Sequence, residues 1–196
     1  MTPPIRLNER AIAKSLTHWD YGTPDALNGS IREAQKDLRQ RSLHLIDIEN
    51  LLGDPFCQDL DLIRKTFDAY GRITKWHPED QVLIAANRWL YSQLLFPLRN
   101  WKCRLFAASG PDGADLRLLQ EARQEKLGRQ FDRLVIGSGD GIFCSILRLA
   151  KDLDVRSLVV CRPGSLSRRL QEASDMAVRL ATDTERCHAT SVAPNL

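Results

Sequence analysis

The segment RLVIGSGDG, residues 133–141, contains the pattern that decides the fold of this chain. Its first part, residues 133–136, is a short apolar run of the kind found in fully buried strands. Its second part is a glycine-rich turn that holds Asp140. Helical spacing follows over residues 142–153. A buried strand, a tight turn and a helix in this order predict one unit of a parallel α/β sheet.

The same succession recurs along most of the chain. Short apolar runs predict further strands at residues 43–46, 81–86, 104–108 and 157–161. Helical spacing predicts helices at residues 60–70 (ended by Gly71), 89–101 (broken at Pro97), 114–124 and 167–181. We therefore expect an α/β fold: a doubly wound, mainly parallel five-stranded sheet in the order 3-2-1-4-5, with helices on both faces.

This pattern also suggests the domain boundaries. Residues 42–181 are predicted to form the α/β domain. Residues 1–41 form an N-terminal extension with two short helical stretches, and residues 182–196 form a polar tail. No apolar stretch reaches the length needed to span a membrane.

Composition and charge narrow the class of protein. The net charge of +3 is too small to indicate a nucleic-acid partner by itself. The five cysteines form no CxxC pair and the four histidines are scattered, so a zinc ribbon or a redox motif is not expected. The first eight residues lack the apolar core of a signal peptide. We expect a cytoplasmic protein.

Three aspartates follow the predicted strands at corresponding places. Asp47 ends the first strand, Asp140 follows the fourth, and Asp115 lies in the first turn of the helix after the third. Strands one and four are neighbours in the order 3-2-1-4-5, and ligands of such sheets bind beyond the carboxyl ends of the strands, where the strand order reverses. The three carboxylates are therefore expected to converge on one crevice.

Converging carboxylates repel one another, by about 4 kcal/mol for a pair about 4 Å apart at an effective dielectric constant near 20. A hard divalent cation such as Mg²⁺ or Mn²⁺ offsets this repulsion, and a bound metal supports phosphodiester hydrolysis. The alternative is that each aspartate only caps a helix or forms a turn. Capping explains Asp115 at least as well when it is taken alone, and the two explanations are balanced for Asp140. The set of three favours the metal site.

Four motifs in order resemble those of the NYN domain family, a branch of the PIN-like ribonucleases. They are Ile46-Asp47-Ile48-Glu49-Asn50, Gly113-Ala114-Asp115-Leu116, Ser138-Gly139-Asp140-Gly141, and the closing run from Leu158 through Ser165 and Leu170 to Asp175. The resemblance covers residues 42–181. It implies the doubly wound PIN-like fold and a metal-dependent endoribonuclease that uses Mg²⁺ or Mn²⁺ on single-stranded or structured RNA.

The resemblance also assigns roles to residues. It implies that Asp47, Asp115 and Asp140 bind the metal, and that Asn50 and Ser138 orient them or contact the phosphate. Arg168 and Arg169 stand at a predicted helix start, where phosphate binds well, and are candidate substrate contacts. Ordinary capping by Ser165 and Ser167 explains that helix start equally.

The chain departs from the family pattern at one position. Family members often carry a second aspartate two residues after the one that matches Asp140, and here that residue is Ile142. Glu49, Asp112 or Asp175 could compensate, although a turn role for Asp112 and a structural role for Asp175 are favoured. The departure supports an alternative: a catalytically weak or inactive NYN-like module that binds RNA or a protein partner. Residues 1–41 could dock on a protein partner or on a second copy of the chain, as a homo-oligomer.

Two further alternatives are open. A nuclease could act only within a larger toxin or defence assembly, which the sequence does not distinguish from RNA processing. Residues 135–141 also imitate the first motif of methyltransferases, a strand followed by a glycine-rich loop. Only 55 residues follow that loop, too few for the rest of such a sheet, so this reading is disfavoured.

Overall fold

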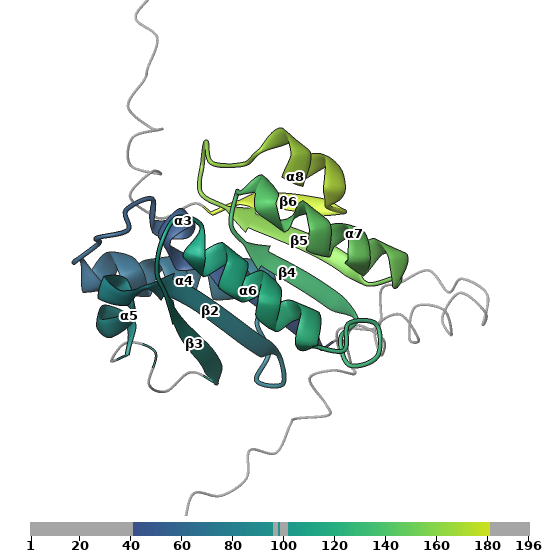
Figure 1. Cartoon of the computed structure of the whole chain (residues 1–196), viewed down its shortest axis with the longest axis horizontal. Coiled ribbons are helices and arrows are strands. Elements are labelled where there is room, and N and C mark those ends of the chain that lie inside the picture. The colour runs from purple at the N-terminus through teal and green to yellow at the C-terminus, as the bar shows by residue number, and fades with distance from the viewer. Residues whose placement is uncertain (1–40, 96–97, 99–101, 181–196) are drawn as a thin grey trace, which may run out of the picture. The chain divides into compact units, whose positions relative to one another are not determined.

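A computed structural model describes residues 41–95, 98 and 102–180. Within these residues the strands form a six-stranded sheet in the order β3-β2-β1-β4-β5-β6, and each neighbouring pair is parallel (Figure 1). The strands are β1 (Ser42–Asp47), β2 (Gln81–Asn87), β3 (Cys103–Ala108), β4 (Arg133–Gly137), β5 (Arg156–Cys161) and β6 (Met176–Arg179). The predicted fold class and the order 3-2-1-4-5 are confirmed, with one strand added.

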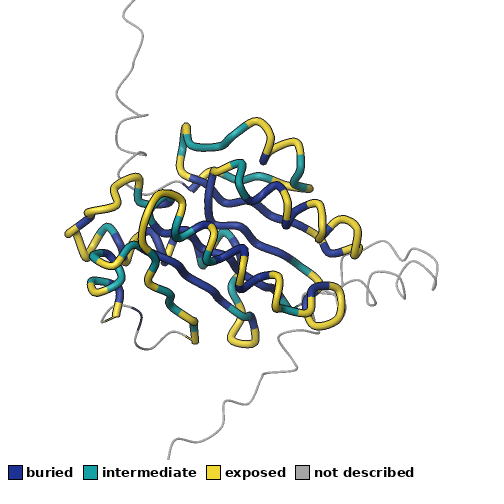
Figure 2. The backbone as a smooth tube through the Cα atoms, viewed as in Figure 1, coloured by how far each residue is buried: buried dark blue, intermediate teal, exposed yellow. Residues whose placement is uncertain are grey.

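Helices cover both faces of this sheet. They are α3 (Ile48–Leu52), α4 (Leu60–Thr74), α5 (Arg88–Leu94), α6 (Gly113–Gln124), α7 (Cys144–Asp152) and α8 (Arg168–Ala173), with a 3₁₀ helix, η1 (Gly141–Phe143). One core cluster joins the sheet to α6, α7 and α8, and a second joins it to α3, α4 and α5. The central strands are buried on both sides, which explains their continuous apolar sequences (Figure 2).

The sixth strand corrects the prediction of a helix over residues 167–181. Helix α8 ends at Ala173, and β6 begins at Met176. The Asp175 carboxylate accepts hydrogen bonds from the backbone N–H and the hydroxyl of Ser157, at 2.7 and 2.9 Å. These bonds fix the chain beside β5. Ala177 and Val178 then pack against opposite core clusters, as successive residues of a strand do.

Two smaller differences concern helix ends. Helix α4 does not stop at Gly71 but continues to Thr74, and Lys75 ends it in the left-handed conformation at φ 51°. Helix α3 follows β1 without a loop and was not predicted. The predicted helical stretches within residues 1–41 and the tail at residues 182–196 lie outside the described residues, apart from Arg41.

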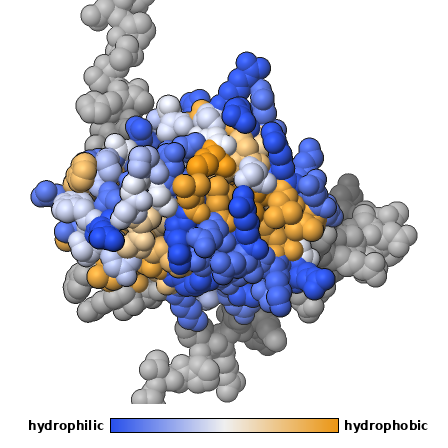
Figure 3. Space-filling view, viewed as in Figure 1, coloured by the Kyte–Doolittle hydropathy of each residue, from blue (hydrophilic) through white to orange (hydrophobic). Residues whose placement is uncertain are grey.

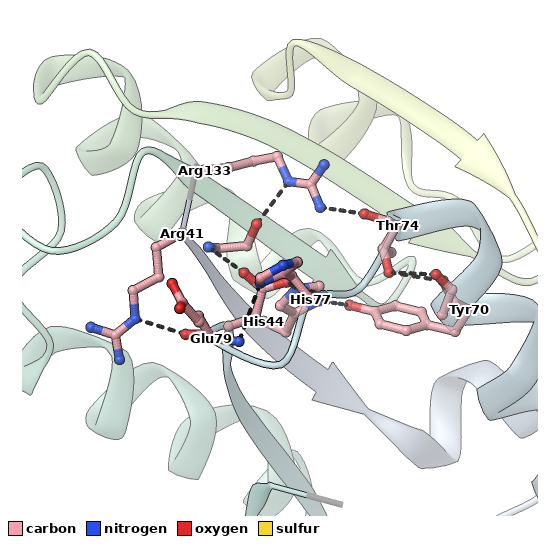
Figure 4. Close-up of polar contacts among 10 residues, drawn as sticks. Arg41, His44, Tyr70, Thr74, His77, Glu79 and Arg133 are labelled. Carbon is pink, nitrogen blue, oxygen red and sulfur yellow. Dashed lines mark hydrogen bonds and ion pairs between the residues drawn. The ribbon is translucent and has the colours of Figure 1, made fainter. Parts of the chain in front are cut away.

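A buried polar network closes the amino edge of the sheet, opposite the site described below (Figure 4). His44 is fully buried, and its ring nitrogens lie 3.0 Å from the Tyr70 hydroxyl and 3.3 Å from Asp80 Oδ2. Asp80 also accepts hydrogen bonds from the backbone N–H groups of Ser42 and His77. The network joins β1, α4 and the loop before β2.

The helical face that carries α6 and α7 is mixed in polarity. Figure 3 shows hydrophobic residues between hydrophilic ones on this face. Leu116, Leu149 and Leu153 are the large exposed apolar residues of these helices and the α7 C-cap. None of the described helices is both long and apolar enough to cross a membrane.

Candidate functional site

A pocket of about 230 Å³ lies at the carboxyl edge of the sheet. Its walls come from the segments that follow β1, β2 and β3, from the start of α6, and from Asp140 after β4. Five of its lining residues are acidic: Asp47, Glu49, Asp112, Asp115 and Asp140. The structure therefore brings the three predicted aspartates to one pocket, at the place where strand order reverses between β1 and β4.

Asp47 is the last residue of β1 and the N-cap of α3. It is 5% exposed. Its Oδ1 accepts a hydrogen bond from the Asn50 backbone N–H at 3.2 Å, and its Oδ2 accepts one from the Ser138 hydroxyl at 3.2 Å. Burial raises the pKa of the Asp47 carboxyl, although these hydrogen bonds act in the opposite direction. The side chain is thus held in one orientation at an electrostatic cost.

Asp115 is the third residue of α6 and is 8% exposed. Its Oδ1 is buried and has no hydrogen-bond partner. Burial raises its pKa to about 8, and the negative charges of Asp47 and Asp140 act in the same direction. The N-cap of α6 is Asp112, not Asp115. Capping therefore does not explain Asp115, whereas a buried acceptor without a partner calls for a cation or a proton.

Asp140 has a local structural role as well as a place in the pocket. It is exposed and is the N-cap of η1, where its Oδ1 accepts a hydrogen bond from the Ile142 backbone N–H at 2.9 Å. Its own backbone N–H donates to the Ser138 hydroxyl at 3.2 Å. Asp140 is therefore a helix cap that also lines the pocket.

Asn50 and Ser138 connect the two loops that carry Asp47 and Asp140. The Asn50 side-chain oxygen accepts a hydrogen bond from the Gly139 backbone N–H at 2.9 Å. Ser138 is fully buried and does not line the pocket, but its hydroxyl contacts both aspartates. These hydrogen bonds join the loop of Asp47 to the loop of Asp140.

The other predicted residues are placed differently. Arg168 and Arg169 are exposed on α8 and do not line the pocket, and Arg168 pairs with Glu172 at 2.8 Å. Ile142 packs against a core cluster instead of facing the acids. Asp175 holds β6 and is remote from the pocket lining.

Two residues that line the pocket, Asp112 and Asn87, are not among the site residues predicted from the sequence. Asp112 was favoured as a turn residue, and its φ of 53° is consistent with that, but it also lines the pocket and its charge raises the pKa of Asp115. Asn87 has no role in the sequence prediction. It ends β2, and its backbone N–H donates to the Glu49 carboxylate. Its place directly after a predicted strand was the available signal, because that edge carries the site.

The donor set fits a hard divalent cation by type. All five acids offer oxygen, the ligand atom that Mg²⁺ and Mn²⁺ prefer, and Asp115 Oδ1 lacks any other partner. In the described residues, however, no three His, Cys, Asp or Glu side chains stand close enough to hold one ion together. Mg²⁺ usually keeps several waters and binds through one or two carboxylates, so the pocket suits such an open site better than a closed cage.

Comparison with known proteins gives the family. The NYN domain family model matches residues 43–181, which is most of the chain and includes every pocket residue. This chain belongs to the NYN domain family. NYN domains are PIN-like and are generally ribonucleases. A search of curated proteins found no match.

One solved structure has the same fold as this NYN domain. It is a protein of unknown function from Vibrio parahaemolyticus, with a TM-score of 0.54 and 16% sequence identity. The match covers 74% of this chain and 94% of that one. At this identity the likeness concerns the fold alone.

Proposed function

We propose that this NYN domain is a metal-dependent endoribonuclease whose acidic pocket hydrolyses RNA phosphodiester bonds. The observation that carries the proposal is Asp115, whose buried Oδ1 has no partner and which lines a pocket shared with Asp47 and Asp140. Without a bound cation, a nuclease pocket would hold carboxylates that repel one another beside an anionic substrate. A bound cation would offset the repulsion between these carboxylates, which explains why they are placed together.

Asp47 and Asp115 are the residues we assign to hold a Mg²⁺ or Mn²⁺ ion, with Asp140 contacting that ion through a bound water. A bound divalent metal lowers the pKa of a coordinated water and stabilises negative charge on phosphate. The chain contributes fixed geometry: Asn50 and Ser138 hold Asp47, and Ser138 links it to the loop of Asp140. Such support keeps acids oriented before substrate arrives.

The cleavage experiment compares wild type with Asp140→Asn on labelled single-stranded and structured RNA, with and without Mn²⁺. Asparagine caps helices as well as aspartate does, so it can retain the bond to Ile142 and leave the fold intact. We expect metal-dependent cleavage that the variant loses. Asp152→Asn, at the exposed end of α7, serves as a matched control and should cleave like wild type.

The second candidate is an inactive NYN-like module that binds RNA or a protein partner. Ile142, which packs against the core where a family acid often stands, favours it. A Mn²⁺ titration followed by melting temperature separates the two. The nuclease should be stabilised by Mn²⁺ and lose that effect in Asp140→Asn, whereas an inert module should show no shift.

A further inference from the structure

The acidic pocket lacks a positive group to receive RNA. Among the described residues that line it, none is a lysine or an arginine. RNA carries a negative charge at every phosphate, and proteins that bind it use arginine and lysine to neutralise that charge. An RNA strand that reaches this pocket therefore needs a positively charged side chain beside it.

Arg162 is placed to supply that positive charge. It is the first residue after β5, the strand beside β4, whose end leads into Ser138 and Asp140. Its guanidinium lies against Gly53, the C-cap of α3. Helix α3 carries Glu49 and Asn50, which line the pocket, so the guanidinium lies against the end of a short helix that forms part of the pocket wall.

Gly53 leaves the room that this side chain occupies. Its φ is 72°, and a Cβ placed on it would stand 2.6 Å from Arg162 Nε. A glycine here both allows the left-handed helix end and lets the guanidinium lie over the backbone. The side chain is therefore packed on one side while the residue as a whole is exposed.

The Arg162 guanidinium is not paired with another group of the described residues. Within the described part of the chain it makes no hydrogen bond or ion pair, and it lies against the backbone of Gly53. Other arginines near the sheet are engaged: Arg104 pairs with Glu121 and Glu125, and Arg168 pairs with Glu172. The N–H donors of Arg162 are therefore available to a partner outside the chain.

We propose that Arg162 is a positioning residue that binds an RNA backbone phosphate next to the one held at the acidic pocket. The proposal rests on the proposed ribonuclease function. It moves the phosphate contact from the arginines of α8, where Arg168 is paired with Glu172, to the arginine that follows β5 directly and lies against the end of α3. Its guanidinium suits phosphate because it offers a planar fork of donors.

The test measures binding of a fluorescein-labelled single-stranded RNA by anisotropy in EDTA, over a series of salt concentrations. Arg162→Ala should bind about fivefold to tenfold more weakly than wild type, since it loses a charge-assisted contact. The slope of log K against log salt should shrink by about one ion. Arg162→Lys should keep the slope and recover part of the affinity, a rescue that a packing role for the side chain would not produce.

Arg129→Ala is the matched control. Arg129 is exposed in the loop before β4, at the opposite edge of the sheet, and its removal should leave binding unchanged. The proposal is overturned if Arg162→Ala binds like Arg129→Ala, or if wild type binds no RNA. Wild-type cleavage with unaltered binding by Arg162→Ala would remove this inference alone. Binding that depends on Arg162, without cleavage, would remove the ribonuclease function alone.

Discussion

The hydroxyl of Ser138 donates a hydrogen bond to Asp47 Oδ2 over 3.2 Å, and it accepts one from the Asp140 backbone N–H over the same distance. One buried side chain thus joins the ends of β1 and β4, which are neighbours at the point where strand order reverses. Two of the three aspartates of the proposed site depend on this contact for their relative position.

Ser138→Ala should therefore weaken the site more than the fold. We expect a stability loss of about 1–2 kcal/mol from the lost hydrogen bonds, and a reduction in Mn²⁺ affinity of about tenfold or more. Calorimetric titration with Mn²⁺ and urea denaturation measure the two effects. Ser145→Ala, on the exposed side of α7, is the control. Equal Mn²⁺ affinity in both variants would contradict the positioning role.

The raised pKa of Asp115 predicts how stability depends on pH without metal. An acid whose pKa is higher in the folded state stabilises the fold below its unfolded pKa, near 4, and this stabilisation is lost as pH rises through about 8. In EDTA, wild type should lose about 1–3 kcal/mol relative to Asp115→Asn between about pH 6 and about pH 9. Urea denaturation of both proteins at these pH values provides the measurement, and parallel pH profiles would contradict it.

Gly139 is expected to tolerate no side chain. A Cβ there would lie 2.2 Å from the backbone oxygen of Ser165, in the loop that follows β5. Gly139→Ala should destabilise the fold by about 1–3 kcal/mol, because backbone must move to relieve the clash. Gly71→Ala is the matched control: it lies within α4 with no atom inside 4 Å of the added carbon. That variant should be neutral or more stable by up to about 1 kcal/mol. Similar losses in both would refute the packing argument.

The buried histidine at the opposite edge predicts acid sensitivity. Burial lowers the pKa of His44 below its ordinary 6.5, so the unfolded chain takes up a proton that the folded chain excludes. Stability should therefore fall as pH drops below about 6.5. Denaturation at about pH 7 and about pH 5 should show this loss in wild type and in the exposed-site control His77→Gln, and a smaller loss in His44→Gln. The same loss in His44→Gln would assign the effect to other groups.

The sequence predicted most of the sheet because its strands are buried on both faces and appear as continuous apolar runs. It failed at β6, where helical spacing of Leu170, Ala173 and Ala177 hid a change from helix to strand. The deciding contact, between Asp175 and Ser157, joins residues 18 apart in sequence and has no local signature. At the site, motif order indicated the three aspartates. The places of Asn87 and Asp112 in the pocket wall could not be predicted, because they depend on which loops lie together in the fold.

Cleavage of a labelled single-stranded RNA across a Mn²⁺ series, by wild type and Asp115→Asn, decides whether the acidic pocket hydrolyses RNA with a bound metal. The substitution keeps the shape of the side chain and removes its charge, and Asp68→Asn, on the exposed side of α4, controls for charge loss alone. We expect Mn²⁺-dependent cleavage by wild type and Asp68→Asn, with a loss of at least about a hundredfold in Asp115→Asn. Wild-type rates in Asp115→Asn, or no cleavage by wild type at any Mn²⁺ concentration, would contradict it.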